Sequence, residues 1–176
     1  MFEKFLRVLL VWGLAIGPLL ADADHDYRLG VGDKVKVAVF GHPELSGELV
    51  VNGGGNIVLP LINEVSAVGL TTYELAERIT WKLKPDYLVN PRVTVALLSY
   101  RPYYILGEVQ NAGSYPYVEG MTVLNAVALA GGFTERANRR KITIERKFGK
   151  TRKKIRATQS SRVEPGDIVF VKERFF

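Results

Sequence analysis

Apolar and polar residues alternate along several short segments of this 176-residue chain. The alternation is clearest at residues 34–39, where Val35, Val37 and Val39 fall on one side of an extended backbone. A period of two predicts a β-strand with one buried face. The same pattern, or a short apolar run between turn residues, predicts further strands at 48–51, 57–61, 93–97, 103–108, 142–144 and 168–171. The first two of these flank a turn at 52–56, and we expect them to pair as a hairpin or meander.

A helical period replaces the alternation after residue 70. Thr71 and Glu74 have the spacing of a capping box. Leu75, Ile79 and Leu83 then recur every four residues, which predicts a helix with one core-facing side. We expect this helix to end before the proline at position 85.

A second helix is predicted at residues 123–130, with Thr122 as its N-terminal cap. Gly131 is well placed to end it, because glycine adopts the left-handed conformation that helix ends require. Phe133 can then pack back on the last turn. The segment is apolar all round, so we expect it to be buried on every side.

One sequence pattern occurs twice. Residues 31–37 and 165–171 each contain a Gly-Asp turn followed by an alternating strand. Glycine supplies a positive φ at such a turn, and aspartate can accept hydrogen bonds from nearby backbone. Asp33 and Asp167 could pair as carboxylates if the two turns met, but a turn role is the simpler explanation. The echo indicates two similarly built β-rich modules. Together with the predicted helices, we expect an α+β fold of two small modules, each with a packed helix, near residues 24–99 and 102–176.

The first 23 residues have the layout of a secretory signal peptide. Lys4 and Arg7 precede an apolar run at 8–20, and Ala-Asp-Ala at 21–23 supplies a small-x-small cleavage pattern. The run is roughly 13 residues, too short for a comfortable membrane span. We therefore expect an exported chain that begins near Asp24, with an uncleaved N-terminal anchor as the alternative.

The composition excludes several classes of site. The chain is 47% hydrophobic and 24% charged, which is typical of a folded domain. It has no cysteine, so it has no disulfide, thiolate ligand, thiol nucleophile or lipid-modified cysteine. Its two histidines, His25 and His42, are far apart in the sequence, and the pattern of acidic residues suggests no all-carboxylate metal site. The glycines at 53–55 and the Gly-Lys-Thr at 149–151 lack the flanking elements of phosphate-binding loops. We expect no metal, no cofactor and no enzymatic activity.

Positive charge is concentrated in one segment. Between Arg136 and Arg156 the chain has eleven lysines and arginines and a single acid, Glu145, whereas the remainder of the exported chain is net acidic. Such a patch attracts anions, and export argues against nucleic acid, so an acidic polysaccharide or an anionic membrane face is favoured. A hairpin whose cations simply face water is the alternative.

Tyrosines cluster just before the basic segment, around Arg101. A flat ring with a polar tip suits sugar faces and protein interfaces equally, and half-buried strand residues are the alternative. The two clusters together predict the following contacts to a polysaccharide or partner: Arg101, Tyr103, Tyr115, Tyr117, Arg139, Arg140, Arg152, Lys153 and Lys154.

Several stretches resemble the bacterial polysaccharide export family, also called outer-membrane polysaccharide export (OPX) proteins. They are YRLGVGDKVKV at 27–37, GNIVLPLI at 55–62, VGLT at 68–71 and NPRVTV at 90–95. The stretch 107–134, followed by Ile-x-Ile-x-Arg at 142–146, resembles a soluble-ligand-binding β-grasp (SLBB) domain. Asn63 departs from the glycine that the family usually has there, so we expect a local difference in that turn.

The resemblance implies a role in exporting capsular polysaccharide or exopolysaccharide. Family members form rings around a conduit for the polysaccharide chain and work with an inner-membrane co-polymerase. This implies a homo-oligomer in the periplasm, associated with the outer membrane. Longer members carry a C-terminal helix that lines an outer-membrane pore, and because the sequence stops at Phe176 we expect a separate outer-membrane channel. A stand-alone periplasmic ligand-binding module and a glycan-acting envelope enzyme are the alternative functions.

Overall fold

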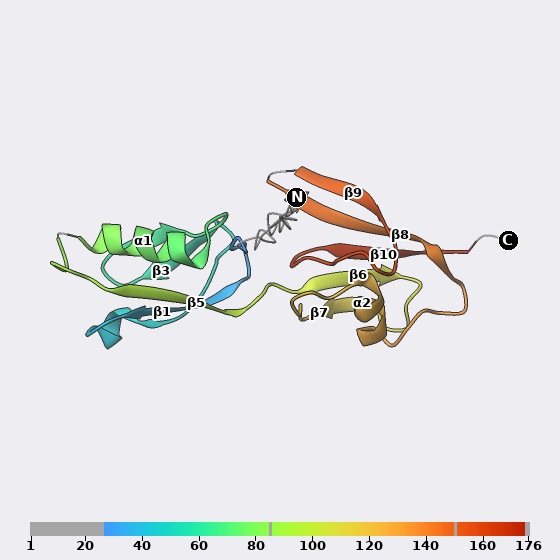
Figure 1. The fold of residues 1–176 in the computed structure, drawn as a ribbon, viewed down its shortest axis with the longest axis horizontal. Coiled ribbons are helices and arrows are strands. Elements are labelled where there is room, and N and C mark those ends of the chain that lie inside the picture. Colours follow the sequence, from blue (N-terminus) through green and yellow to red (C-terminus); the bar gives the residue numbers. More distant parts are fainter. Residues whose placement is uncertain (1–26, 85, 150, 175–176) are drawn as a thin grey trace, which may run out of the picture.

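The computed structural model describes residues 27–84, 86–149 and 151–174. The predicted signal peptide lies outside these residues. The described chain forms two modules that follow one another along the long axis of the molecule, each with its own hydrophobic core and one α-helix (Figure 1). The predicted α+β class is confirmed.

The first module combines two small antiparallel sheets with helix α1. One sheet has the strand order β2-β1-β5, and the other pairs β3 with β4. Val35, Val37 and Val39 of β1 are buried, as the alternation predicts. The elements are β1 (Lys34–Val39), a 3-10 turn (Pro43–Leu45), β2 (Gly47–Val50), β3 (Asn56–Leu59), β4 (Asn63–Ser66), α1 (Thr72–Leu83) and β5 (Val93–Ser99).

Helix α1 has the predicted cap and the predicted core side. The Thr71 hydroxyl accepts from the Glu74 N–H, and the Glu74 carboxylate accepts from the Thr71 N–H. Leu75, Ile79 and Leu83 are all buried. Local sequence therefore determines where this helix begins and which side it buries.

The expected pairing across the turn at 52–56 is wrong. Strand β2 pairs with β1, whereas β3 pairs with β4, a strand that the hydrophobic pattern does not reveal. The turn that joins β3 to β4 places Leu61 at φ 68° and Asn63 at φ 54°. Asparagine tolerates this conformation better than most residues, which fits its presence at this departure from the family pattern. Partners distant in sequence, rather than the local turn, decide the pairing here.

The second module is a five-stranded sheet with the order β7-β6-β10-β8-β9, covered on one face by helix α2 (Figure 1). Strands β6 and β10 run parallel and the other neighbours are antiparallel. The elements are β6 (Tyr103–Gly107), β7 (Gly113–Tyr115), α2 (Val123–Leu129), β8 (Ala137–Phe148), β9 (Thr151–Ala157) and β10 (Ile168–Glu173).

Helix α2 has the predicted ends but not the predicted burial. Thr122 caps its start, and Gly131 follows its last turn at φ 82°. Phe133 packs against the core beyond this stop, as expected. The prediction of burial on every side is wrong, because Leu124 and Leu129 are about half exposed. A helix that packs on one sheet face leaves its far side in solvent even when that side is apolar.

The repeated Gly-Asp turns have the same internal geometry. Asp33 accepts a hydrogen bond from the Gly30 N–H at 2.7 Å, and Asp167 accepts one from the Glu164 N–H at 2.8 Å. The glycine before each aspartate has a positive φ. Both carboxylates are almost fully buried, so the prediction that each is a turn residue is confirmed.

The two turns lie on either side of Arg101. Its backbone N–H and its guanidinium both donate to Asp33, at 2.7 and 3.0 Å. A Cβ added to Gly166, in the second turn, would lie 2.9 Å from the Arg101 Nε. Arg101 therefore joins the modules, and Asp33 pairs with this arginine. Asp167 has its own arginine partner, Arg146, with N–O distances of 2.7 to 3.3 Å.

Candidate functional site

Most of the basic segment forms the β8–β9 hairpin, in which β9 is an edge strand. Its register places Thr143 opposite Arg156, Glu145 opposite Lys154 and Lys147 opposite Arg152. Residues directly opposite in an antiparallel pair point to the same side of the sheet. Ile142 and Ile144 point to the opposite side, where they are buried under α2 in the core of the second module. The hairpin thus presents a cationic row on the sheet face away from the helix.

Apolar side chains continue this face across the neighbouring strands. Phe170 lies between Leu106 and Thr143, and Ile168 lies between Tyr104 and Glu145. Phe170 is 37% exposed, Leu106 43% and Tyr104 44%, although the intervening strand residues are fully buried. We call this surface the outer sheet face. It comprises Tyr104, Leu106, Thr143, Glu145, Lys147, Arg152, Lys154, Arg156, Ile168 and Phe170.

The predicted basic contacts fall in three places. Arg152 and Lys154 lie on the outer sheet face, and the Lys154 Nζ lies 5.9 Å from the centre of the Phe170 ring. Lys153 points to the opposite side and lies near Phe148. Arg139 and Arg140 are exposed near the other end of β8. Arg140 is seven residues from Lys147, roughly 23 Å along the strand.

The predicted tyrosines belong mainly to the core and to the module junction. Tyr103 is fully buried, and burial raises its pKa to about 12. Its side chain therefore has no exposed surface with which to contact a polysaccharide or a partner. Tyr115 is half-buried and stacks on Tyr103. Tyr117 is half-buried against Tyr100, and burial raises its pKa as well.

Arg101 also has a structural position. Besides Asp33, its guanidinium donates to the Tyr27 hydroxyl at 2.7 Å. The rings of Tyr27, Tyr100 and Tyr117 follow one another edge to face across the junction, with centres 4.8 and 5.1 Å apart. These contacts make the junction a packed joint.

The contacts predicted from the sequence do not include Tyr104 and Phe170, the two exposed aromatic residues of the outer sheet face. Tyr103 and Tyr104 are adjacent in a strand, so a period of two places one ring inside and one outside. The sequence contains no local signal for which ring is inside. The register of β6 against β10 decides it, and points Tyr104 outwards.

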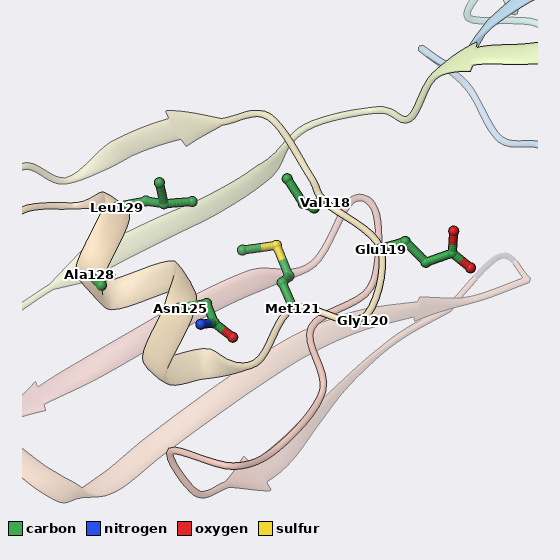
Figure 2. A pocket seen from close by; sticks show the side chains of 7 residues that line it. All are labelled: Val118, Glu119, Gly120, Met121, Asn125, Ala128 and Leu129. Atoms are coloured by element: carbon green, nitrogen blue, oxygen red, sulfur yellow. The ribbon is translucent and has the colours of Figure 1, made fainter.

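A shallow pocket lies beside α2, away from the outer sheet face (Figure 2). Its lining is mainly apolar and includes Val118, Met121 and Leu129. The Glu119 side chain points away from these three (Figure 2). The Asn125 side-chain carbonyl already accepts from the Thr122 N–H. The pocket therefore offers apolar contact and little polar recognition.

Among residues 27–84, 86–149 and 151–174, no three His, Asp or Glu side chains gather in a way that could hold a metal ion. Within the same residues, no helix combines the length and the apolar character needed to cross a membrane.

Each of the two modules matches the sequence model of a known domain family. Residues 21–98 match the sequence model of "Polysaccharide biosynthesis/export protein", and residues 102–156 match the SLBB domain. The chain thus contains a polysaccharide export domain followed by an SLBB domain. The expected resemblance is thus confirmed for both parts of the chain, and the outer sheet face lies within an SLBB domain.

Curated members of the polysaccharide export family share substantial identity with the chain. "Exopolysaccharide production protein ExoF" of Rhizobium meliloti is 39% identical over 151 residues, which are 78% of this chain and 36% of that protein. "Polysialic acid transport protein KpsD" of Escherichia coli is 36% identical over 109 residues, 61% of this chain and 20% of that protein. "EPS I polysaccharide export outer membrane protein EpsA" of Ralstonia nicotianae is 29% identical, over 90% of this chain and 50% of that protein. The chain thus spans half or less of the length of each of these relatives.

Proposed function

We propose that this protein is a component of a machine that exports exopolysaccharide or capsular polysaccharide across the cell envelope. One observation carries the proposal: an export domain and an SLBB domain stand in one chain whose relatives are named for polysaccharide production, transport and export. The protein would act in the periplasm at the outer membrane. It would handle the polymer without cutting or modifying it.

In this proposal, copies of the chain assemble head to tail into a ring. Such heterologous contacts need two different surfaces on each subunit. Exposed apolar side chains on both helices support this arrangement: Tyr73 and Trp81 on α1, and Leu124 and Leu129 on α2. The packed joint at Arg101 would keep the two surfaces at a fixed separation. The ring would meet an inner-membrane co-polymerase on one side and an outer-membrane channel on the other.

Transport in this scheme is passive. A conduit must release each segment of polymer that it contacts, so its contacts should be weak and repeated. Exposed lysine and arginine side chains in solvent make contacts of this kind, because water and salt screen them.

Deleting the gene in its host tests the proposal. Extracellular polysaccharide should fall to background while polymer or its lipid-linked precursors accumulate inside the cell. Complementation with the wild-type gene should restore export. A Gly107→Val gene should not, since a Cβ there would lie 2.1 Å from the Val171 carbonyl oxygen. Unchanged export in the deletion strain would refute the proposal.

Two measurements on the purified protein separate the alternatives. A ring at native mass supports the export machine, whereas a monomer that binds a small molecule tightly beside α2 supports a stand-alone ligand-binding module. Incubation with purified host polymer should leave its chain length unchanged. Shortened polymer would instead indicate a glycan-acting enzyme.

A further inference from the structure

The outer sheet face combines exposed aromatic rings with a row of cations. We infer that this face binds the polysaccharide itself, and that the polymer it recognises is anionic. The inference rests on the proposed function, because it assigns a ligand class and a site to the polymer that the machine would carry. It differs from the sequence prediction in its residues, since only Arg152 and Lys154 are common to both.

Within the described part of the chain, most cations of this face have no ion-pair partner. Glu145 is its single acid and lies 4.0 Å from Arg152. Among the described residues, no carboxylate oxygen lies within 4.0 Å of Lys147, Lys154 or Arg156. By contrast, Arg146, on the other side of β8, is held by Asp167 and Glu164. Four cations against one acid favour a ligand that carries repeated negative charge.

The aromatic side of the face suits sugar rings. Tyr104 and Phe170 belong to the neighbouring strands β6 and β10, and Leu106 lies next to Phe170. The C–H faces of a sugar can pack on such rings, and the Tyr104 hydroxyl, which has no hydrogen-bond partner among the described residues, can bond a sugar hydroxyl. From Tyr104 to Lys154 the face crosses three strand spacings, roughly 14 Å. This width accommodates sugar rings on the aromatic side and their acidic groups on the cationic side.

The centre of the face contains an unsatisfied polar atom. Thr143 lies between Phe170 and Arg156, and its hydroxyl oxygen is buried without a hydrogen-bond partner among the described residues. Buried hydroxyls in folded proteins nearly always have a partner. A polymer hydroxyl that displaces a neighbouring side chain would supply one.

The test is a binding measurement on the full chain with two matched probes. Oligogalacturonate carries one carboxylate per sugar, and its methyl ester has the same backbone without the charge. Oligogalacturonate should bind at low salt and weaken steadily as ionic strength rises. The methyl ester should bind about tenfold more weakly, because it loses the charge-assisted contacts. Equal binding of both probes would overturn the inference.

Charge-reversal variants place the site. The triple variant Arg152→Glu, Lys154→Glu, Arg156→Glu should lower the affinity for oligogalacturonate at least about tenfold. The control variant Lys36→Glu, Lys84→Glu, Arg92→Glu changes the net charge equally, but on exposed residues of the first module. Its affinity should fall by no more than about threefold, as expected for a diffuse field effect. An equal loss in both variants would show that net charge alone attracts the probe, and would refute a site on this face.

Aromatic variants test the other half of the face. Tyr104→Ala with Phe170→Ala should weaken binding by about fivefold, from the loss of ring contact. The control is Tyr87→Ala with Phe40→Ala, two exposed rings of the first module, which should leave affinity unchanged. Unaltered affinity in the Tyr104 and Phe170 variant would contradict the sugar-stacking role.

A measurement on the unmodified protein guards against variants that misfold. Adding oligogalacturonate should shift the backbone NMR signals of Tyr104, Thr143 and Phe170 and leave those of α1 in place. Shifts confined to other surfaces would overturn the inference. So would a face that is occupied by a second copy of the chain, seen as self-association that the triple variant abolishes while oligogalacturonate affinity is unchanged. If gene deletion stops export but the protein fails these tests, the inference falls and the proposed function stands.

Discussion

The two Gly-Asp turns of this protein have nearly the same internal hydrogen bonds, but they bind arginines from different parts of the chain. In each turn the buried aspartate carboxylate accepts hydrogen bonds from the backbone N–H three residues earlier and from an arginine side chain. In the second module the arginine is Arg146 of β8, so the turn is bonded to a strand of its own module. In the first module it is Arg101, which precedes β6, so the turn fastens one module to the other. The local Gly-Asp motif thus determines the conformation of the turn. Whether the turn stabilises one module or joins two depends on which part of the chain supplies the arginine.

The largest effect should come from removing a turn carboxylate. Asp167→Ala leaves Arg146, whose side chain is 18% exposed, without its buried partner. Breaking a buried ion pair from one side costs about 3–5 kcal/mol of folding free energy. Denaturant unfolding, with hydrogen exchange at Ile144 and Val169, should show the loss in the second module. The same protection in the first module should persist, and a uniform loss would contradict the view that this turn is an internal brace.

The joint itself is tested by Arg101→Ala. Asp33 keeps its bonds from Tyr27 and Gly30 but loses a charged donor, which costs about 1.5–3 kcal/mol. The modules should also separate, and small-angle scattering should report a larger and broader range of dimensions. Arg146→Ala is the matched control, because it should destabilise the second module without moving the two modules apart. Unchanged scattering from the Arg101 variant would show that other contacts hold the joint.

Alanine substitutions at the turn glycines should have a smaller effect. Gly32 and Gly166 have φ values of 94° and 84°, and a left-handed conformation costs a non-glycine residue roughly 1–2 kcal/mol. Gly166→Ala should cost more than Gly32→Ala, because its Cβ would lie 2.9 Å from Arg101 whereas that of Gly32 would lie 3.4 Å away. Thermal unfolding of the two variants measures the difference. The reverse order would place Arg101 away from the second turn.

The smallest effect concerns Tyr27, for which the second turn has no counterpart. Tyr27→Phe removes the 2.6 Å bond to Asp33 and should cost about 1 kcal/mol at neutral pH. Burial, followed by the bond to Asp33, raises the pKa of Tyr27, so the unfolded chain releases this proton at lower pH than the folded one. The stabilisation is therefore complete below a pH of about 10 and declines above it. Denaturation curves between pH 9 and 12 should decline less steeply for Tyr27→Phe, and parallel curves would contradict the assignment.

Helix ends were predictable because their causes are local. The Thr71–Glu74 capping box and the Gly131 stop each depend on residues within one helical turn. Burial of α2 was not predictable in the same way. Its apolar residues surround the helix, and only the position of the sheet shows that Leu124 and Leu129 face outwards.

The positive charge of the candidate site was predictable from the sequence, but the residues that form the site were predictable only in part. The sequence shows a cationic segment, and the alternation of a strand divides it between two sides. The choice between those sides follows from the packing of α2, which buries Ile142 and Ile144 and leaves Arg152 and Lys154 on the other face. Tyr104 joins them because the parallel pairing of β6 with β10 turns it outwards and Tyr103 inwards.

The sequence by itself determined the turns, the helix ends, the alternation of each strand and the resemblance to polysaccharide export proteins. These features depend on residues close together in the chain, where backbone conformation and side-chain type act directly. The tertiary structure decided which strands pair, which side of each strand is covered, and that Arg101 belongs to both modules. Those outcomes depend on contacts between residues far apart in sequence, such as Arg101 and Asp33, whose 68-residue separation no local pattern records.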